Sequence, residues 1–418
     1  TPKIVPADED SNITIRPLYE NVRFENEKEY KVKYKPVHNT TEKKLEAEES
    51  EFYVTCQKGV LDIELFFAGE QEHVLIIIDE IEKEEKEIGV FHIYSIESDL
   101  YQKKPLKGDL HLHSFRSDGE GSPAYMMTIR RKIGFDFIAL TDHRKYKPSI
   151  EAQKIFEDAE IDLNIINGEE VHPPENPVHL VNFGGNFSVN DLFKKKEIYE
   201  KEVAEIKENL TFIPEGVDKY QYASFVWTSR KIQEAEGLAI FCHPFWINKK
   251  KHYISDKLTS YLLKEKPFDA LEVINGSISL ESNNLQVVKY YNYINKRETK
   301  RKEPVIGVSD AHHCDLGVGY SVVFSDNKSV DNIIDNIKNS YCVAVENIDR
   351  QSPRVYGSTR LVKYTNFLMR EIFPEHDKLC YEEGNYMMKY INNKEKYSSR
   401  LAELKGRVNK LYSDMGIN

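Results

Sequence analysis

Several features are absent from this chain of 418 residues, and each absence narrows the class of protein. No apolar run approaches the roughly 18 residues that a membrane-spanning helix needs, so we expect no membrane partner. The net charge of −11 leaves no general basic surface for long nucleic acids. Repeats and low-complexity tracts are missing as well, while apolar residues make up 40% of the chain. This composition is sufficient for a sizeable folded core.

Cysteine is sparse and irregularly placed. The five cysteines are odd in number and form no CxxC pair. This usage is typical of reduced thiols rather than of a disulfide framework, so we expect a cytoplasmic protein. The first residue is Thr rather than Met, which leaves a removed signal peptide open.

The pattern of the sequence changes twice along the chain. Residues 1–105 contain short alternating apolar segments, which predict a small all-β sandwich. From residue 106 to 350, strand-like segments alternate with helical ones, which predicts a parallel, barrel-like α/β domain. Residues 351–418 have a helical pattern and are expected to form a helical extension. The strands expected in the central domain are Lys107–His111, Phe137–Thr141, Leu163–Asn167, Val178–Phe183, Leu238–Cys242, Asp269–Ile274 and Pro304–Val308.

The most informative stretch is GDLHLHSFRSDGEG at Gly108–Gly121. His111 and His113 stand one residue apart at the end of an apolar run, so on a strand both side chains project to the same side. Two neutral imidazoles this close can bind a divalent transition metal. The HxH pair alone is also compatible with two partly exposed strand histidines, so the interpretation depends on further ligands elsewhere.

Further histidines and carboxylates do occur at the ends of successive expected strands. Nine of the thirteen histidines lie between His111 and His313. In barrel-like α/β proteins the catalytic groups gather at the C-terminal ends of the strands, where independent structural histidines are not expected to collect. The segments concerned are Asp118 after the first strand, then Thr141-Asp142-His143, Gly168-Glu169-Glu170, His179, Cys242-His243-Pro244 and Ser309-Asp310-Ala311-His312.

This series of motifs resembles the polymerase-and-histidinol-phosphatase (PHP) family of metal-dependent phosphoesterases. HLHSFRSDG, TDH, GEE followed by HLVNFG, CHP and SDAH occur in order over roughly Lys107–Val345. The resemblance implies a distorted seven-stranded (β/α) barrel that holds up to three divalent cations in a cleft. The sandwich and the C-terminal helices lie outside the resemblance.

The resemblance also implies which residues hold each cation. Imidazole and carboxylate ligands together suit Zn, Mn or Fe better than Mg or Ca. The presence of aspartate rather than histidine at position 118 resembles the branch of the family that acts on small phosphoesters. The first metal would take His111, His113, Glu170 and Asp310; Glu170 would bridge to a second metal on His179 and His243; Asp118, His143 and His312 would hold the third.

Neighbouring polar residues are interpreted as supporting ones. Strand alternation lets only one of Glu169 and Glu170 face the cleft, and the spacing of the motif indicates Glu170. Asp142 is expected to orient a loop or a ligand. Trp246 can either stack on a substrate ring or pack in the interior, and both readings stay open. His252 is expected at the surface or on the substrate side.

Clustered cations supply hydroxide at neutral pH and neutralise a phosphoryl group. We therefore expect hydrolysis of a phosphate ester of a small metabolite or nucleotide by a metal-bridging hydroxide held by Glu170 and Asp310. Arg116 and Arg144 flank expected ligands and are predicted to bind the phosphate. The alternatives are a phosphodiesterase or exonuclease on short oligonucleotides, and a non-catalytic metal-binding scaffold whose β-domain binds a glycan or a partner protein. The oligomeric state does not follow from the sequence.

Overall fold

A computed structural model describes residues 1–18, 23–37, 49–81, 84–295, 304–314, 319–347 and 352–417. The chain divides into two compact units, Thr1–Lys104 with Lys363–His376 and Gly406–Asn418, and Pro105–Val362 with Asp377–Lys405. The predicted helical C-terminal region is present, and its helices are shared between the two units. The division into three consecutive domains stays a prediction. The C-terminal helices are α9 (Thr359–Glu371), α10 (Phe373–Asn392), α11 (Lys394–Leu404) and α12 (Arg407–Asp414).

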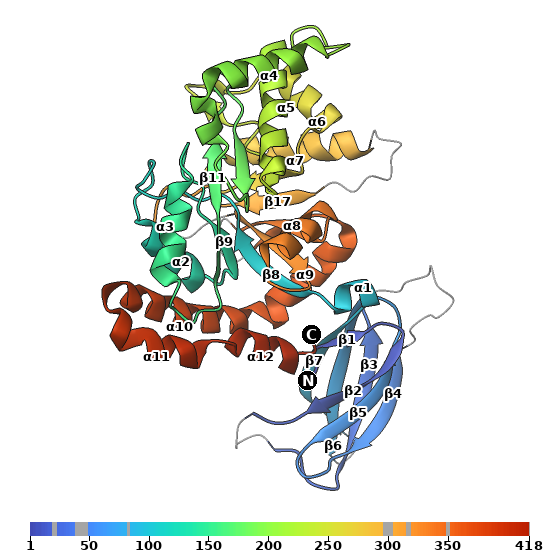
Figure 1. Ribbon diagram of the computed structural model, residues 1–418. Coiled ribbons are helices and arrows are strands. Elements are labelled where there is room, and N and C mark those ends of the chain that lie inside the picture. Colours follow the sequence, from blue (N-terminus) through green and yellow to red (C-terminus); the bar gives the residue numbers. More distant parts are fainter. Residues whose placement is uncertain are drawn as a thin grey trace. The chain divides into compact units, whose positions relative to one another are not determined.

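The first unit is built on two antiparallel β-layers (Figure 1). One sheet has the order β1-β7-β6-β3-β4, with β1 added in parallel at its edge, and the other pairs β2 with β5. Tyr30, Val32 and Tyr34 alternate on β3 and share a core with Leu61 and Ile63 of β5, so the two sheets form a sandwich. The short alternating apolar segments of residues 1–105 form strands, as the sequence predicted. The strands are β1 (Ile4–Pro6), β2 (Glu9–Ile15), β3 (Glu29–Pro36), β4 (Ser50–Thr55), β5 (Leu61–Phe67), β6 (Gln71–Ile81) and β7 (Glu84–Ile96).

The second unit contains two larger sheets with helices around them (Figure 1). One sheet has the order β10-β9-β8-β18-β19-β20 and the other β11-β12-β13-β16-β17. The strands are β8 (Lys104–Asp109), β9 (Phe137–Ala139), β10 (Asn164–Ile166), β11 (Gly168–Val171), β12 (Leu180–Phe183), β13 (Leu238–Phe241), β16 (Ala270–Asn275), β17 (Val305–Val308), β18 (Gly319–Ser325), β19 (Cys342–Glu346) and β20 (Arg354–Tyr356), with a small hairpin of β14 (Ile247–Asn248) and β15 (Lys251–His252).

The sheets of this unit are mixed, whereas the sequence predicted parallel strands. β8, β9 and β10 run parallel, as do β13, β16 and β17, but β12 is antiparallel to both β11 and β13. Strand β11 was not expected, because GEEV carries two carboxylates and has no apolar alternation. Among the described residues the strands form two hydrogen-bonded sheets, and a closed seven-stranded barrel is not confirmed. Buried side chains of both sheets nevertheless share one core, with Leu106 and Phe137 from one and Val181 and Ile306 from the other.

Helices cover these sheets and begin at recognisable caps. Ser122 caps α2 (Pro123–Lys132), Asp218 caps α5 (Lys219–Glu234) and Ser255 caps α6 (Asp256–Glu265), each by accepting a backbone N–H three residues on. Helices α4 (Lys196–Glu208) and α5 run side by side (Figure 1). None of the described helices combines the length and apolar character needed to cross a bilayer. The remaining helices are α1 (Ser98–Tyr101), α3 (Lys147–Phe156), α7 (Leu280–Asn295) and α8 (Val330–Lys338), with a 3-10 turn at Asn190–Lys194.

A buried charge pair fastens α10 to α2 within the second unit. The Arg131 guanidinium donates from Nε to Glu383 and from Nη1 to the carbonyl of Phe135 at 2.9 Å. Glu383 also accepts from the backbone N–H of Asp162. Both side chains of the pair are nearly inaccessible to solvent, at 1% and 3% exposure.

We predict that Glu383→Ala destabilises the second unit by about 3 kcal/mol, because it removes one of the two buried carboxylates that pair with the Arg131 charge and leaves only Asp136, 3.2 Å from Nη1. Glu382→Ala on the same helix is the matched control. Glu382 pairs with Arg400 near the surface, and loss of such a pair costs less than about 1 kcal/mol. Urea unfolding of both variants measures the difference, and equal losses would contradict the buried pair.

The sandwich of the first unit encloses a neutral histidine, His73 of β6. Its Nδ1 lies 2.8 Å from the Tyr34 hydroxyl and its Nε2 lies 2.7 Å from the Ser95 hydroxyl. Burial lowers the pKa of His73 to about 3. In the unfolded chain the imidazole titrates near its ordinary pKa of about 6.5, so protonation favours the unfolded state.

We predict that the stability contributed by neutral His73 is complete above about pH 6.5 and is lost as the pH falls toward 3, by up to about 1.4 kcal/mol per pH unit. Hydrogen exchange of the β6 amides at pH 7 and pH 5, corrected for intrinsic rates, measures this loss. His73→Gln should weaken the pH dependence, and His92→Gln, a half-buried histidine on β7 of the same sheet, should not. A pH dependence that His73→Gln leaves unchanged would refute the assignment.

Candidate metal centre

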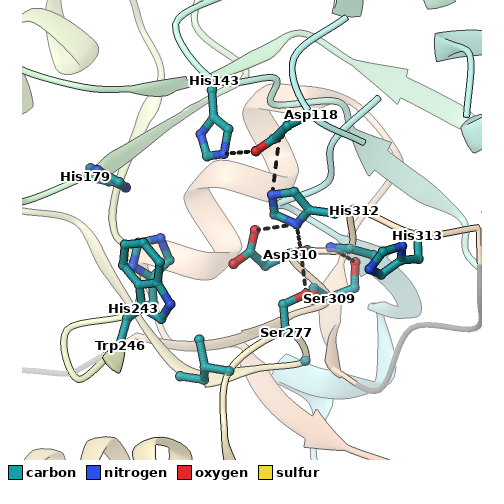
Figure 2. Close-up of a pocket in the computed structure, with 13 residues that line it drawn as sticks. Asp118, His143, His179, His243, Trp246, Ser277, Ser309, Asp310, His312 and His313 are labelled. Atoms are coloured by element: carbon teal, nitrogen blue, oxygen red, sulfur yellow. Dashed lines mark hydrogen bonds and ion pairs between the residues drawn. The ribbon is translucent and has the colours of Figure 1, made fainter. Parts of the chain in front are cut away.

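The structure brings all nine predicted ligands into one cluster in the second unit. They come from segments that follow β8, β9, β13 and β17, from β11 itself and from the residue before β12. A pocket of about 420 Å³ opens over them. Figure 2 shows Asp118 between His143 and His312, with Asp310 beneath His312 and Trp246 beside His243. The structure gives the position of each residue, and its role as a metal ligand stays a prediction.

The Glu170 carboxylate lies at the middle of the cluster. It is inaccessible to solvent, and six imidazoles approach its two oxygens. Oε1 lies 2.8 Å from His179 Nδ1, 3.4 Å from His243 Nε2 and 3.5 Å from His172 Nε2. Oε2 lies 2.5 Å from His143 Nδ1, 3.4 Å from His111 Nε2 and 3.6 Å from His113 Nε2.

Two further carboxylates extend the cluster on either side. Asp310 Oδ1 lies 3.0 Å from His113 Nε2 and 3.3 Å from His111 Nε2. Asp118 reaches His143 Nε2 at 3.3 Å and His312 Nε2 at 3.5 Å. Possible ligand atoms of His113 lie within 4.8 Å of those of His111 and Glu170, and also of those of Asp118, His143 and His312. His113 is therefore placed between the first and third predicted ligand sets.

The donor atoms of this cluster fit divalent metal ions. His111 Nε2, His179 Nδ1 and Glu170 Oε2 are buried, and they have no hydrogen-bond partner although oppositely charged atoms stand close by. Buried polar atoms are rarely left without a partner, because each one costs about 1–3 kcal/mol. Ligand atoms that share a metal at about 2.1 Å lie roughly 3.0–3.4 Å apart. Many of the separations in the cluster fall at or near this range, so the lone pairs converge as a coordination shell requires.

The charge states also suit metal binding. Burial lowers the pKa of His179 to about 4, so this imidazole is neutral at pH 7 with a free lone pair. For His111, burial alone would lower the pKa, but the carboxylates of Asp310, Glu272 and Glu170 together raise it well above its ordinary value. These carboxylates attract positive charge to the His111 ring, and a bound cation would supply that charge in place of the proton.

Glu272 belongs to the site and was missed by the sequence reasoning. Its Oε1 lies 2.7 Å from His111 Nδ1, and its Oε2 accepts the backbone N–H of His243 at 3.0 Å. A carboxylate on the far nitrogen of a ligating histidine sets its tautomer and ring orientation. The available signal was a single carboxylate within the apolar, wholly buried strand β16. Asn275 at the end of that strand donates to Asp310 Oδ2 at 3.0 Å.

The neighbouring acidic residues hold the ligand-bearing loops. Asp142 accepts the backbone N–H groups of Ser114 and Ser117 at 3.0 Å each, as the orienting role predicted for it requires. Glu169 points away from the cluster and accepts from Ser188 and Asn190 at 2.8 Å each. Glu170, not Glu169, therefore faces the site.

Two histidines border the cluster differently. The ring of His172 stacks on that of His179 at 3.8 Å, and its Nε2 lies 2.9 Å from His143 Nδ1. His313 is exposed and pairs with Glu120 at 2.9 Å. His172 therefore supports two predicted ligands, whereas His313 lies on the rim of the pocket (Figure 2).

The two predicted phosphate-binding arginines lie in different surroundings. Arg116 makes a bidentate ion pair with Glu151, from Nε and Nη2 at 2.9 Å each, and lies over the ring of Phe115. The Arg144 guanidinium has no hydrogen bond or ion pair with any described residue and lines a cavity beside the metal pocket. Its backbone has a φ of 58°, a left-handed conformation unusual for a residue with a side chain. The geometry favours Arg144 over Arg116 for phosphate binding.

Comparison with protein-family models gives no match, and no curated protein matches the chain. The similar solved structures include a two-domain protein from Bacteroides vulgatus containing a predicted PHP-like metal-dependent phosphoesterase, at 18% identity and a TM-score of 0.39. The match covers 59% of this chain and 66% of that one, slightly less than two thirds of its length. That protein is of the same PHP-like class that the motifs of this sequence resemble.

Two other similar structures have comparable scores. A candidate metal-dependent phosphoesterase from Bifidobacterium adolescentis is 18% identical with a TM-score of 0.33, covering 49% of this chain and 87% of that one. An amidohydrolase from Chromobacterium violaceum, with bound sulfate and no metal, is 17% identical with a TM-score of 0.34, covering 59% of this chain and 99% of that one.

We predict that Glu170→Gln loses bound transition metal, because an amide cannot supply the negative charge on which six imidazoles converge. Metal content after dialysis against Mn or Zn, measured by plasma mass spectrometry, should fall by at least one equivalent per chain. Glu169→Gln, the adjacent and equally buried carboxylate, should retain the metal if circular dichroism shows a folded protein. Equal metal content in wild type and Glu170→Gln would exclude Glu170 as a ligand.

Proposed function

We propose that the second unit is a metal-dependent hydrolase that acts on phosphate esters of small molecules. The single observation that carries the proposal is the buried Glu170 carboxylate with six imidazoles within 3.6 Å, next to Asp310 at the base of an open pocket. Imidazole and carboxylate ligands in this ratio suit Zn, Mn or Fe. Up to three cations would use the predicted sets around Glu170, Asp310 and Asp118.

When bound, such cations supply Lewis acidity and a hydroxide at neutral pH. The protein side chains fix where that chemistry takes place. Glu272 and Asn275 hold His111 and Asp310 in place, and Arg144 is free to bind a phosphate oxygen. The surrounding burial strengthens each of these electrostatic interactions.

A covalent route through a protein nucleophile is not supported. Cys242 directly precedes His243, but its thiol is inaccessible to solvent. Burial, with the Glu272 charge adding to it, raises the pKa of this thiol well above its ordinary value. The thiolate needed for nucleophilic attack is therefore disfavoured, and Cys242 acts as a small buried side chain.

Small substrates fit the site better than long nucleic acids, given the net charge of −11. The competing functions are phosphodiester cleavage of short oligonucleotides, and a metal-binding scaffold without catalysis. The turnover of monoester and diester substrates distinguishes both of these functions from phosphomonoester hydrolysis.

We predict that the Mn- or Zn-loaded protein hydrolyses p-nitrophenyl phosphate faster than bis-p-nitrophenyl phosphate, and that chelation abolishes the activity. Asp310→Asn should lower kcat by about 100-fold or more, because one charge that holds the metals is removed. Lys154→Gln, on the exposed surface of α3, is the control and should leave kcat unchanged.

Faster turnover of the diester or of short oligonucleotides would favour the phosphodiesterase. A metal-loaded protein that hydrolyses none of a broad panel of phosphoesters would favour the scaffold.

A further inference from the structure

A second cavity, of about 680 Å³, opens beside the metal pocket. Hydrolysis of a bare phosphate group does not require this volume. His179 lines both the metal pocket and the second cavity, so the two spaces adjoin at a predicted metal ligand. The organic part of an ester held at the metals therefore has a place beside the reaction centre. The other walls of the cavity include Arg144, His172, Asn176, Phe193 and Tyr253.

The boundary between the two spaces is an aromatic corner made by Trp246 and Tyr253. Trp246 lines the metal pocket (Figure 2), and Tyr253 lines the second cavity. Their ring centroids are 4.9 Å apart with an interplanar angle of 62°, and both rings lie within 6.3 Å of the His179 ring. Tyr253 is 41% exposed. An exposed aromatic face on a cavity wall is a platform for a planar ring of a ligand.

The hairpin β14–β15 connects these two aromatic residues and carries three consecutive lysines, Lys249, Lys250 and Lys251. All three are exposed, and none of their ammonium groups has a hydrogen bond or ion pair with any residue that the structure describes. Lys249 and Lys250 form the turn with φ values of 49° and 67°. Such a turn favours Asn-Gly over residues with long side chains, so turn geometry does not account for the lysines.

These positive charges are unusual in their setting. The chain is acidic overall, with a net charge of −11, yet Arg144 lines the second cavity and the lysine hairpin extends from the aromatic corner, and none of these cations pairs with a described carboxylate. The cavity wall also carries Glu175 and Asp191, and Asp191 pairs with Lys194. Unpaired cations at the mouth of a cleft attract anions and raise their local concentration. The scissile phosphate itself would lie on the metals, so these cations are available to a second anionic group.

We propose that the aromatic corner and the lysine hairpin select the substrate. The scissile phosphate lies in the metal pocket, a planar ring of the organic part packs on Tyr253, and a second anionic group meets Arg144 and the hairpin lysines. The substrate class is thus a phosphate ester that carries a ring and a further carboxylate or phosphate. This inference rests on the proposed phosphoesterase function.

Binding of three non-hydrolysable probes to the metal-loaded full chain tests the inference. The probes are methylphosphonate, phenylphosphonate and 4-phosphonobenzoate, and calorimetry measures each Kd. Phenylphosphonate should bind about fivefold tighter than methylphosphonate because of the ring contact. The carboxylate of 4-phosphonobenzoate should add about another fivefold at low salt, and this gain should shrink in 0.5 M NaCl because exposed charges are screened.

Two variants test which residues produce each gain in affinity. Tyr253→Ala should remove the gain from the ring and leave methylphosphonate binding unchanged. A triple variant with Lys249→Gln, Lys250→Gln and Lys251→Gln should remove the gain from the carboxylate. The matched control changes three exposed lysines on α3 and α4, Lys154→Gln, Lys201→Gln and Lys207→Gln, and should keep both gains although its net charge is the same.

Each result has a distinct meaning. Equal Kd values for the three probes, or gains that survive in the hairpin and Tyr253 variants, would overturn the selection of ring-bearing anions. If the protein hydrolyses p-nitrophenyl phosphate while the probes bind equally, only this inference fails. If the probe gains and their loss in the variants are found but no ester is hydrolysed, the binding site stands and the proposed hydrolysis fails.

Discussion

The second unit is organised around one electrostatic constraint, the burial of the Glu170 carboxylate among imidazoles. Removing a carboxylate from water costs several kcal/mol unless opposite charge and hydrogen bonds compensate. Six histidines surround Glu170, yet its Oε2 has no hydrogen-bond partner. Divalent cations at the meeting point of these lone pairs would satisfy both the carboxylate and the imidazoles. The same constraint brings together ligands from the segments that follow β8, β9, β13 and β17, from β11 and from the residue before β12.

Buried carboxylates hold the ligand-bearing segments of the second unit together. Asp109 at the end of β8 accepts the backbone N–H of Ser309, which ties the His111 segment to the segment that carries Asp310. Asp142 holds the loop after His113, and Glu272 holds His111. Each of these carboxylates is fully buried and engaged with a neighbouring segment. Ligand positions far apart in the sequence are therefore kept together without relying on the metal alone.

Charge is distributed unevenly between the site and its rim. The interior is rich in carboxylates, whereas Arg144 and the hairpin Lys249–Lys251 bring positive charge to the edge. Arg116 shows that position in the sequence does not identify a substrate contact, because it lies between His113 and Asp118 yet pairs with Glu151. Arg144 has no such partner and faces a cavity. The direction of a side chain, not its distance along the chain from a ligand, separates the two arginines.

The sequence by itself determined the types and order of the candidate ligands, the choice of Glu170 over Glu169, the sandwich strands and the alternation of strands with helices. These properties depend on local periodicity and on the chemistry of single residues. Only the tertiary structure determined the antiparallel placement of β12, the arrangement in two large sheets, the contact of Glu272 with His111 and the position of Trp246 and Tyr253 beside His179. Each depends on contacts between residues distant in sequence, here 161 positions apart for Glu272 and His111, and such contacts leave no local pattern along the chain.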